Sequence, residues 1–138
     1  MADWDEHLII KTLSRNDSLA NKIIPELSID HFISTPYRKT FKRILSFYGK
    51  SGRILTWKEL LHDPVLSDKI ITRLKSREIK RKALVNKDAA LRLPININEL
   101  KVIFENLVVN SQYIKLIDLQ NKLSDKLKDK KMNTEEVE

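Results

Sequence analysis

Residues 98–128 read NELKVIFENLVVNSQYIKLIDLQNKLSDKLK and contain neither glycine nor proline. Such a stretch predicts one long helix, which at 1.5 Å per residue would be about 45 Å long. A small globular body is narrower than that, so the helix should extend beyond it. A helix of this kind needs more than one packing partner.

The apolar pattern changes midway along this predicted helix. The first half carries a broad apolar stripe made of Leu100, Ile103, Phe104, Leu107 and Val108. The second half carries a narrow stripe made of Leu116, Leu119, Leu123 and Leu127. At 100° per residue, the second stripe points nearly opposite to the first. We therefore expect the first half to pack on residues 1–93 and the second half to pack on another helix.

The last residues resemble the start of a further helix. Asn133 is a favourable capping residue, and Glu136 follows it three positions later. The sequence ends two residues after Glu136. We interpret residues 98–138 as a long helix and the start of a truncated helical hairpin.

Residues 1–97 are predicted to form a helical globular domain. The chain has two glycines, whereas average usage would give about ten, so a fold rich in β-hairpins is not expected. Thr35 and Pro36 have the residue types that begin a helix, and Gly49 and Gly52 have the type that ends one. Thr56-Trp57-Lys58-Glu59 is a capping box, and Ser67 can cap another helix. The predicted fold is all-α, a small orthogonal helical bundle followed by the long helix.

Composition limits where the protein works. Cysteine is absent, which excludes disulfides and thiolate chemistry. Apolar runs are too short to cross a membrane, and the acidic start, MADWDE, is unlike a signal peptide. Apolar residues make up 41% of the chain, which is typical of a folded protein. We expect a soluble cytoplasmic protein that does not bind membranes.

The sequence contains no recognisable catalytic or metal-binding motif. Gly49-Lys50-Ser51 matches the end of a phosphate-binding loop, but Ile44 stands where that motif needs its first glycine. The three histidines, His7, His31 and His62, lack the spacing of helical metal ligands. We therefore predict no catalytic residue, no metal and no cofactor, and a chain that is not itself an enzyme.

The positive charge is concentrated in one segment. The formal net charge is +7, and residues 66–92 hold nine basic and three acidic side chains. These cations are candidates for contacts with DNA phosphates or with a partner: Lys69, Arg73, Lys75, Arg77, Lys80, Arg81 and Lys82. The alternative is an ordinary solvated helix face. No aromatic residue lies between Trp57 and Phe104, so base stacking is not supported in this segment.

Several pieces of the chain together resemble a known family. In order, they are EHLIIKTL at 6–13, IPELSIDHF at 24–32, YRKTFKRI at 37–44, residues 52–60, residues 98–119 and NTEEV at 133–137. Their order and spacing are similar to those of the N-terminal domain of DnaB-type replicative helicases, including the diverged versions of T-even-like phages. Ile54-Leu55 stand where that family has an aspartate, and residues 67–97 do not align. These departures favour a phage or otherwise diverged member.

The resemblance implies a noncatalytic collar domain. In that family, N-terminal domains pair through their helical hairpins, and three pairs form a ring around the DNA path. The ring docks primase and the helicase loader, while an ATP-dependent motor lies in a separate C-terminal domain. By this resemblance, self-association would involve Leu116, Leu119, Leu123 and Leu127. If the protein is encoded by a phage, it would work in the host cytoplasm.

Two other classes stay open. A free-standing basic accessory protein of DNA replication, such as a helicase loader or a nucleic-acid-binding factor, would bind DNA as an isolated chain. A helical regulator unrelated to replication would share only the amphipathic pattern, and would bind neither DNA nor a primase.

Overall fold

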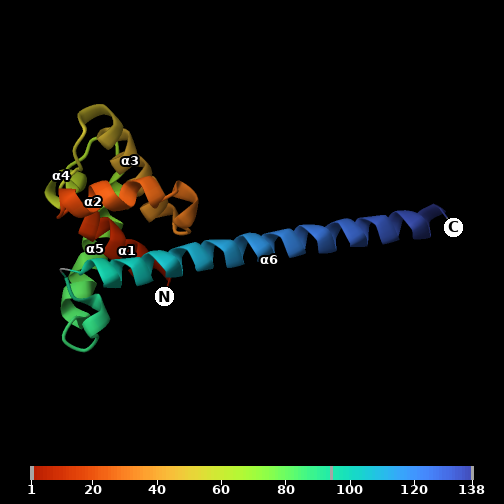
Figure 1. The fold of residues 1–138 in the computed structure, drawn as a ribbon. Helices are drawn as coiled ribbons and strands as arrows, with labels where there is room; N and C mark the ends of the chain where they lie inside the picture. Colours follow the sequence, from red (N-terminus) through yellow and green to blue (C-terminus); the bar gives the residue numbers. More distant parts are fainter. Residues whose placement is uncertain (1, 94, 138) are drawn as a thin grey trace.

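The structure is a helical body from which one long helix projects (Figure 1). This computed structural model describes residues 2–93 and 95–137, with side chains for 4–93 and 95–130. The described α-helices are α1 (Ala2–Leu13), α2 (Asp17–Ile23), α3 (Thr35–Ser51), α4 (Trp57–Leu61), α5 (Asp68–Leu84) and α6 (Ile97–Val137). Short 3-10 turns are η1 (Ile24–Glu26), η2 (Ile29–His31) and η3 (Ala89–Leu91). The predicted all-α fold is confirmed.

The predicted helix starts agree with the structure to within about one residue in α3, α4 and α5. Ser34, one position before the expected Thr35, occupies the N-cap position of α3 without a capping hydrogen bond from its side chain, and Pro36 lies in the first turn. Thr56 forms the predicted capping box with Glu59 at the start of α4. Ser67 caps α5 by accepting from the Ile70 amide at 3.3 Å. These local signals act because helix ends leave backbone amides without intrahelical partners.

Two glycines near the end of α3 allow a matched test of helix termination. Gly52 has φ of 72°, a left-handed conformation that costs other residues about 1 kcal/mol or more. Gly49, also predicted to end the helix, lies inside it with open space around its Cα, because only Gly52 takes the left-handed conformation. We expect Gly52→Ala to destabilise the fold by about 1 kcal/mol, and Gly49→Ala to stabilise it by about 0.5–1 kcal/mol. Urea denaturation of both variants checks the opposite signs, and equal effects would contradict this account.

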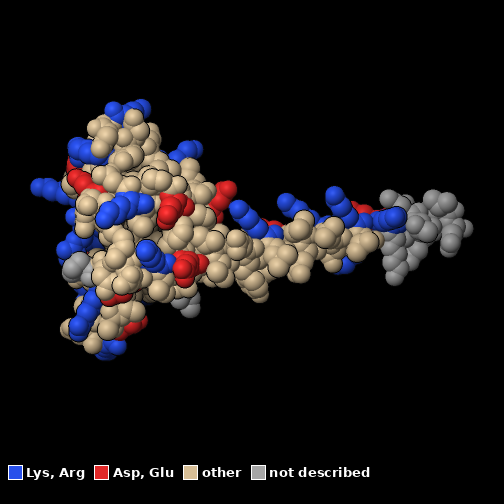
Figure 2. Space-filling view, in the orientation of Figure 1, with Lys and Arg blue, Asp and Glu red and all other residues tan. Residues whose placement is uncertain are grey.

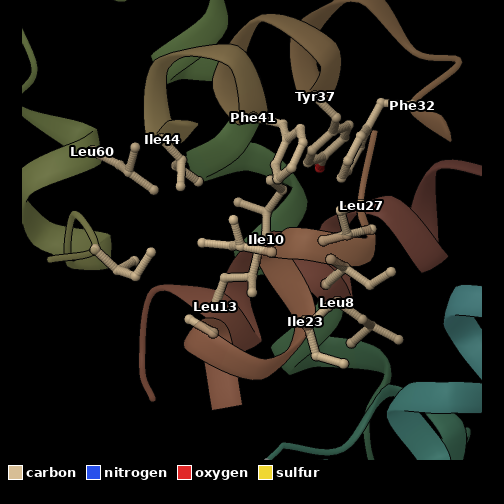
Figure 3. Packing of buried hydrophobic residues seen from close by; sticks show 14 of the residues in the cluster. Leu8, Ile10, Leu13, Ile23, Leu27, Phe32, Tyr37, Phe41, Ile44 and Leu60 are labelled. Atoms are coloured by element: carbon tan, nitrogen blue, oxygen red, sulfur yellow. The ribbon is translucent and has the colours of Figure 1, made fainter. Parts of the chain in front are cut away.

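The core lies between α1 and α3. Ile9, Ile10 and Leu13 of α1 are fully buried. Phe32 stacks on Phe41, with ring centroids 4.6 Å apart, and Figure 3 shows this pair above α1. The apolar face of α3 is most buried at Tyr37, Phe41 and Ile44.

Helix α6 is divided between the body and solvent. Leu100 and Leu107 are buried, and the Phe104 ring meets the His31 ring edge-on at 5.6 Å. Every residue from 112 to 130 is exposed, and Figure 1 shows this half extending away from the body. The prediction that the first half packs on the body is therefore confirmed.

The second hairpin arm expected at Asn133 is not found. Helix α6 continues through this residue to Val137. A capping residue begins a helix only where the preceding backbone has left helical geometry. Residues 128–137 contain no glycine or proline to cause such a break, so the Asn133 signal lies within a continuing helix.

Candidate interaction surfaces

The exposed half of α6 carries an apolar stripe. The four predicted leucines, Leu116, Leu119, Leu123 and Leu127, are between 53% and 67% exposed. Two valines nearer the body, Val102 and Val109, are 57% and 60% exposed. They are not among the residues that the leucine pattern predicts.

These residues form one continuous line along α6. Val102, Val109, Leu116 and Leu123 are seven residues apart, and seven residues turn a helix by 700°, which is within 20° of two full turns. We call these four residues with Leu119 and Leu127 the α6 seam. By the same rotation, the seam lies opposite Leu107, which packs on the body. The body therefore leaves the seam uncovered along its whole length.

Many charged side chains of α6 lie away from the seam, but Glu105 and Lys126 are spaced from Leu119 by multiples of seven residues and share its side of the helix. In Figure 2, basic tips gather along the upper edge of the helix, whereas most of its lower edge carries no charge. Lys115 Nζ lies 3.9 Å from Asp30 Oδ2, where the helix leaves the body. The projecting half is thus amphipathic, with a charged side and an apolar side.

The basic residues of α5 do not form a single face. Five of the seven predicted cations are exposed, namely Lys69, Arg73, Lys75, Lys80 and Lys82. Helical rotation places Lys69, Arg73 and Lys80 on one side, and Lys75 and Lys82 about 120° or more away. The predicted cluster is therefore divided between two directions.

The other two predicted cations are involved in packing. Arg77 is half-buried, and its guanidinium lies 4.9 Å from the centre of the Trp4 ring. Arg81 is only 6% exposed, binds Glu78 through Nε at 2.6 Å, and donates through Nη1 to the Leu91 carbonyl at 2.8 Å. Arg81 thus lies inside the body, not on the surface where a contact with DNA or a partner was expected.

Glu78 is the centre of a buried polar network. Its carboxylate binds three basic side chains: Arg81, His7 Nε2 at 3.1 Å and Lys11 Nζ at 3.3 Å. The other ring nitrogen of His7 lies 2.7 Å from the Tyr37 hydroxyl. These contacts connect α1, α3 and α5.

The network determines the charge of Glu78. Burial alone raises the pKa of this carboxyl, but the hydrogen bonds from Arg81 and His7 and the charge of Lys11 outweigh that effect. Its pKa therefore lies well below the ordinary 4.5, and Glu78 is ionised at neutral pH. Burial lowers the pKa of Lys11, and the nearby Glu78 partly offsets this. The only feature of the sequence that marks this buried network is Glu78 itself, a single acidic residue within a run of basic residues.

The weak motifs noted in the sequence have ordinary structural roles. Gly49, Lys50 and Ser51 lie in the last turn of α3 and do not form a phosphate-binding loop. His31 Nδ1 accepts from the Ser28 amide as part of a capping box, and His62 Nδ1 lies 2.9 Å from the Lys58 carbonyl oxygen. Among the described residues, no three metal-binding side chains gather, and no helix is apolar over enough of its length to cross a membrane.

Comparison of the chain with family models, with curated proteins and with solved structures returns no match.

Proposed function

We propose that this chain is the noncatalytic N-terminal domain of a hexameric DnaB-type replicative helicase. In this role it mediates ring assembly and docks primase, a helicase loader or both. The observation that carries the proposal is the uncovered α6 seam on a helix that projects from a compact helical body. The ordered sequence resemblance points to the same class.

The seam has the geometry of an association surface. Apolar residues at seven-residue intervals pack against a matching helix when the two helices wind around each other with a left-handed twist. A second copy supplies such a helix, and the seam faces away from the body, so the body does not obstruct it. Each leucine that is fully buried contributes about 1.5–3 kcal/mol. Pairing along α6 is therefore the first step expected in assembly of a ring.

The gene gives a direct test of the helicase proposal. We expect the reading frame to continue past the codon for Glu138 into a motor domain containing Gly-x-x-x-x-Gly-Lys-[Ser/Thr]. A stop codon directly after Glu138 would overturn the helicase assignment.

The exposed side of α5 favours a second candidate function. A free-standing basic accessory protein would bind DNA phosphates through Lys69 and Lys80, which lie on one side of the helix. For duplex DNA, each phosphate contact contributes about 0.9 to the slope of log affinity against log salt. In this case, Lys69→Ala/Lys80→Ala should reduce the slope by about 1.8, and Lys75→Ala/Lys82→Ala should reduce it less. DNA titration at several salt concentrations measures the difference, and equal slopes for both variants would exclude this surface.

A further inference from the structure

Two adjoining hollows lie between α3 and α5. Both are lined by Lys39, Ser67 and Ile70, and their volumes are about 440 and 560 Å³. We call the combined depression the α3–α5 groove. Each volume falls within the usual range for ligand sites, and several side chains of a bound segment would fit there.

The rim of the α3–α5 groove is basic. Lys39 and Lys42 approach it from α3, and Lys69 approaches it from α5. All three lysines are exposed. None of the described residues that line either hollow is acidic or aromatic. The groove is therefore complementary to a negatively charged partner.

The floor of the groove is aliphatic and held in place. Leu66 and Ile70 form buried parts of it, and Val65 is 67% exposed at one end. Arg43 Nε of α3 binds both carboxylate oxygens of Asp63 at 3.0 Å. Asp63 Oδ1 accepts from the Val65 amide at 2.8 Å and from the Leu66 amide at 3.2 Å. This ion pair fixes the loop before α5, so the groove exists before a partner binds.

We propose that the α3–α5 groove binds a short acidic amphipathic segment of a partner protein. The carboxylates of that segment meet Lys39, Lys42 and Lys69, and its aliphatic side chains rest on Val65 and Ile70. An amphipathic helix in a groove is a common mode of peptide recognition. Nucleic acid fits less well, because phosphates need no aliphatic floor and the described lining offers no aromatic ring for stacking bases. The inference rests on the docking part of the proposed function and is independent of self-association.

Selection from a random peptide library tests this proposal. Peptides of about twelve residues, long enough for three helical turns, are displayed on phage and selected on the wild-type chain. Lys39→Glu/Lys69→Glu serves for counter-selection. We expect the selected peptides to combine Asp or Glu with Leu, Ile or Val. Selection of basic or aromatic peptides, or of none that depends on the two lysines, would overturn the proposal.

Fluorescence anisotropy with a selected peptide locates the site. Lys39→Glu/Lys69→Glu should weaken binding about tenfold or more, because like charges then face each other across the interface. Val65→Ser, which removes apolar surface without adding charge, should weaken it as well, whereas Lys75→Glu/Lys82→Glu, outside the groove, is the charge-matched control and should change it less than twofold.

A single-stranded thymidine oligonucleotide is titrated in parallel to separate the two ligand classes. If it binds through Lys39 and Lys69 and is insensitive to Val65→Ser, while the peptide does not compete, the groove is a nucleic-acid site and the proposal fails. Light scattering of Lys39→Glu/Lys69→Glu should give the wild-type mass. Failure of docking is thereby distinguished from failure of self-association.

Discussion

Leu119→Asp/Leu123→Asp is expected to convert the chain into a monomer while leaving its body folded. Both leucines are more than half exposed in the single chain, so the change removes little packing from the body. In a symmetric pair it removes four leucines from the interface, which costs about 6 kcal/mol or more. That corresponds to a loss in affinity of about four powers of ten. Light scattering gives the mass, and far-UV circular dichroism gives the helix content.

A matched control separates loss of the seam from a general effect of added charge. Asn121→Asp/Ser124→Asp introduces the same two negative charges into the same stretch of α6, but away from the seam. This variant should keep the wild-type mass. If the leucine variant also keeps that mass, the α6 seam is not the association surface, and the ring-assembly proposal loses its main support.

Glu78→Ala is expected to be among the most destabilising single substitutions in the body. It leaves His7, Lys11 and Arg81 without their shared carboxylate, and all three are largely buried. Removing one partner from a buried ion pair typically costs about 3–5 kcal/mol. For a chain of this size, that lowers the melting temperature by about 10–15 °C. Thermal denaturation followed by circular dichroism measures the shift.

Acid titration gives an independent check on Glu78. Because folding lowers its pKa, the unfolded chain binds its proton more readily, and Glu78 contributes stability above the ordinary pKa of 4.5. That contribution is lost as the pH falls below 4.5 toward the folded-state pKa. Glu78→Gln should therefore show a weaker loss of stability with acid than the wild type. Lys80→Ala, at an exposed position on the same helix, should leave both stability and its pH dependence nearly unchanged.

Local sequence signals predict much of this fold. Ser67 and the Thr56–Glu59 box begin helices because a side chain meets a backbone amide two or three residues away. The division of α6 into a packed half and an exposed half likewise follows from helical rotation within one segment. The predicted start of a second hairpin helix at Asn133 is wrong. A capping residue is recognised from its own sequence neighbours, whereas the start of a new helix also requires the preceding backbone to leave helical geometry.

The candidate sites depend on contacts that no local pattern contains. His7 and Glu78 are 71 positions apart and meet only because α1 packs against α5. Lys39 and Lys69 share a groove because α3 and α5 are neighbours in the fold. Arg81 is basic like its neighbours in the sequence, and only tertiary packing distinguishes it from an exposed cation.

The way α6 leaves the body has a consequence for how assemblies of this chain are shaped. Its first turns pack on the body, and its described residues include no glycine or proline at which the helix could kink. The projecting half therefore behaves as a straight, rigid helix, here called the shaft. Each residue inserted after Ser111 would advance the leucines by 1.5 Å and also turn them by about 100°. The length of the shaft therefore sets the twist between two joined bodies as well as their separation. Insertions of whole heptads nearly preserve that twist, whereas most other lengths change the symmetry of the assembly.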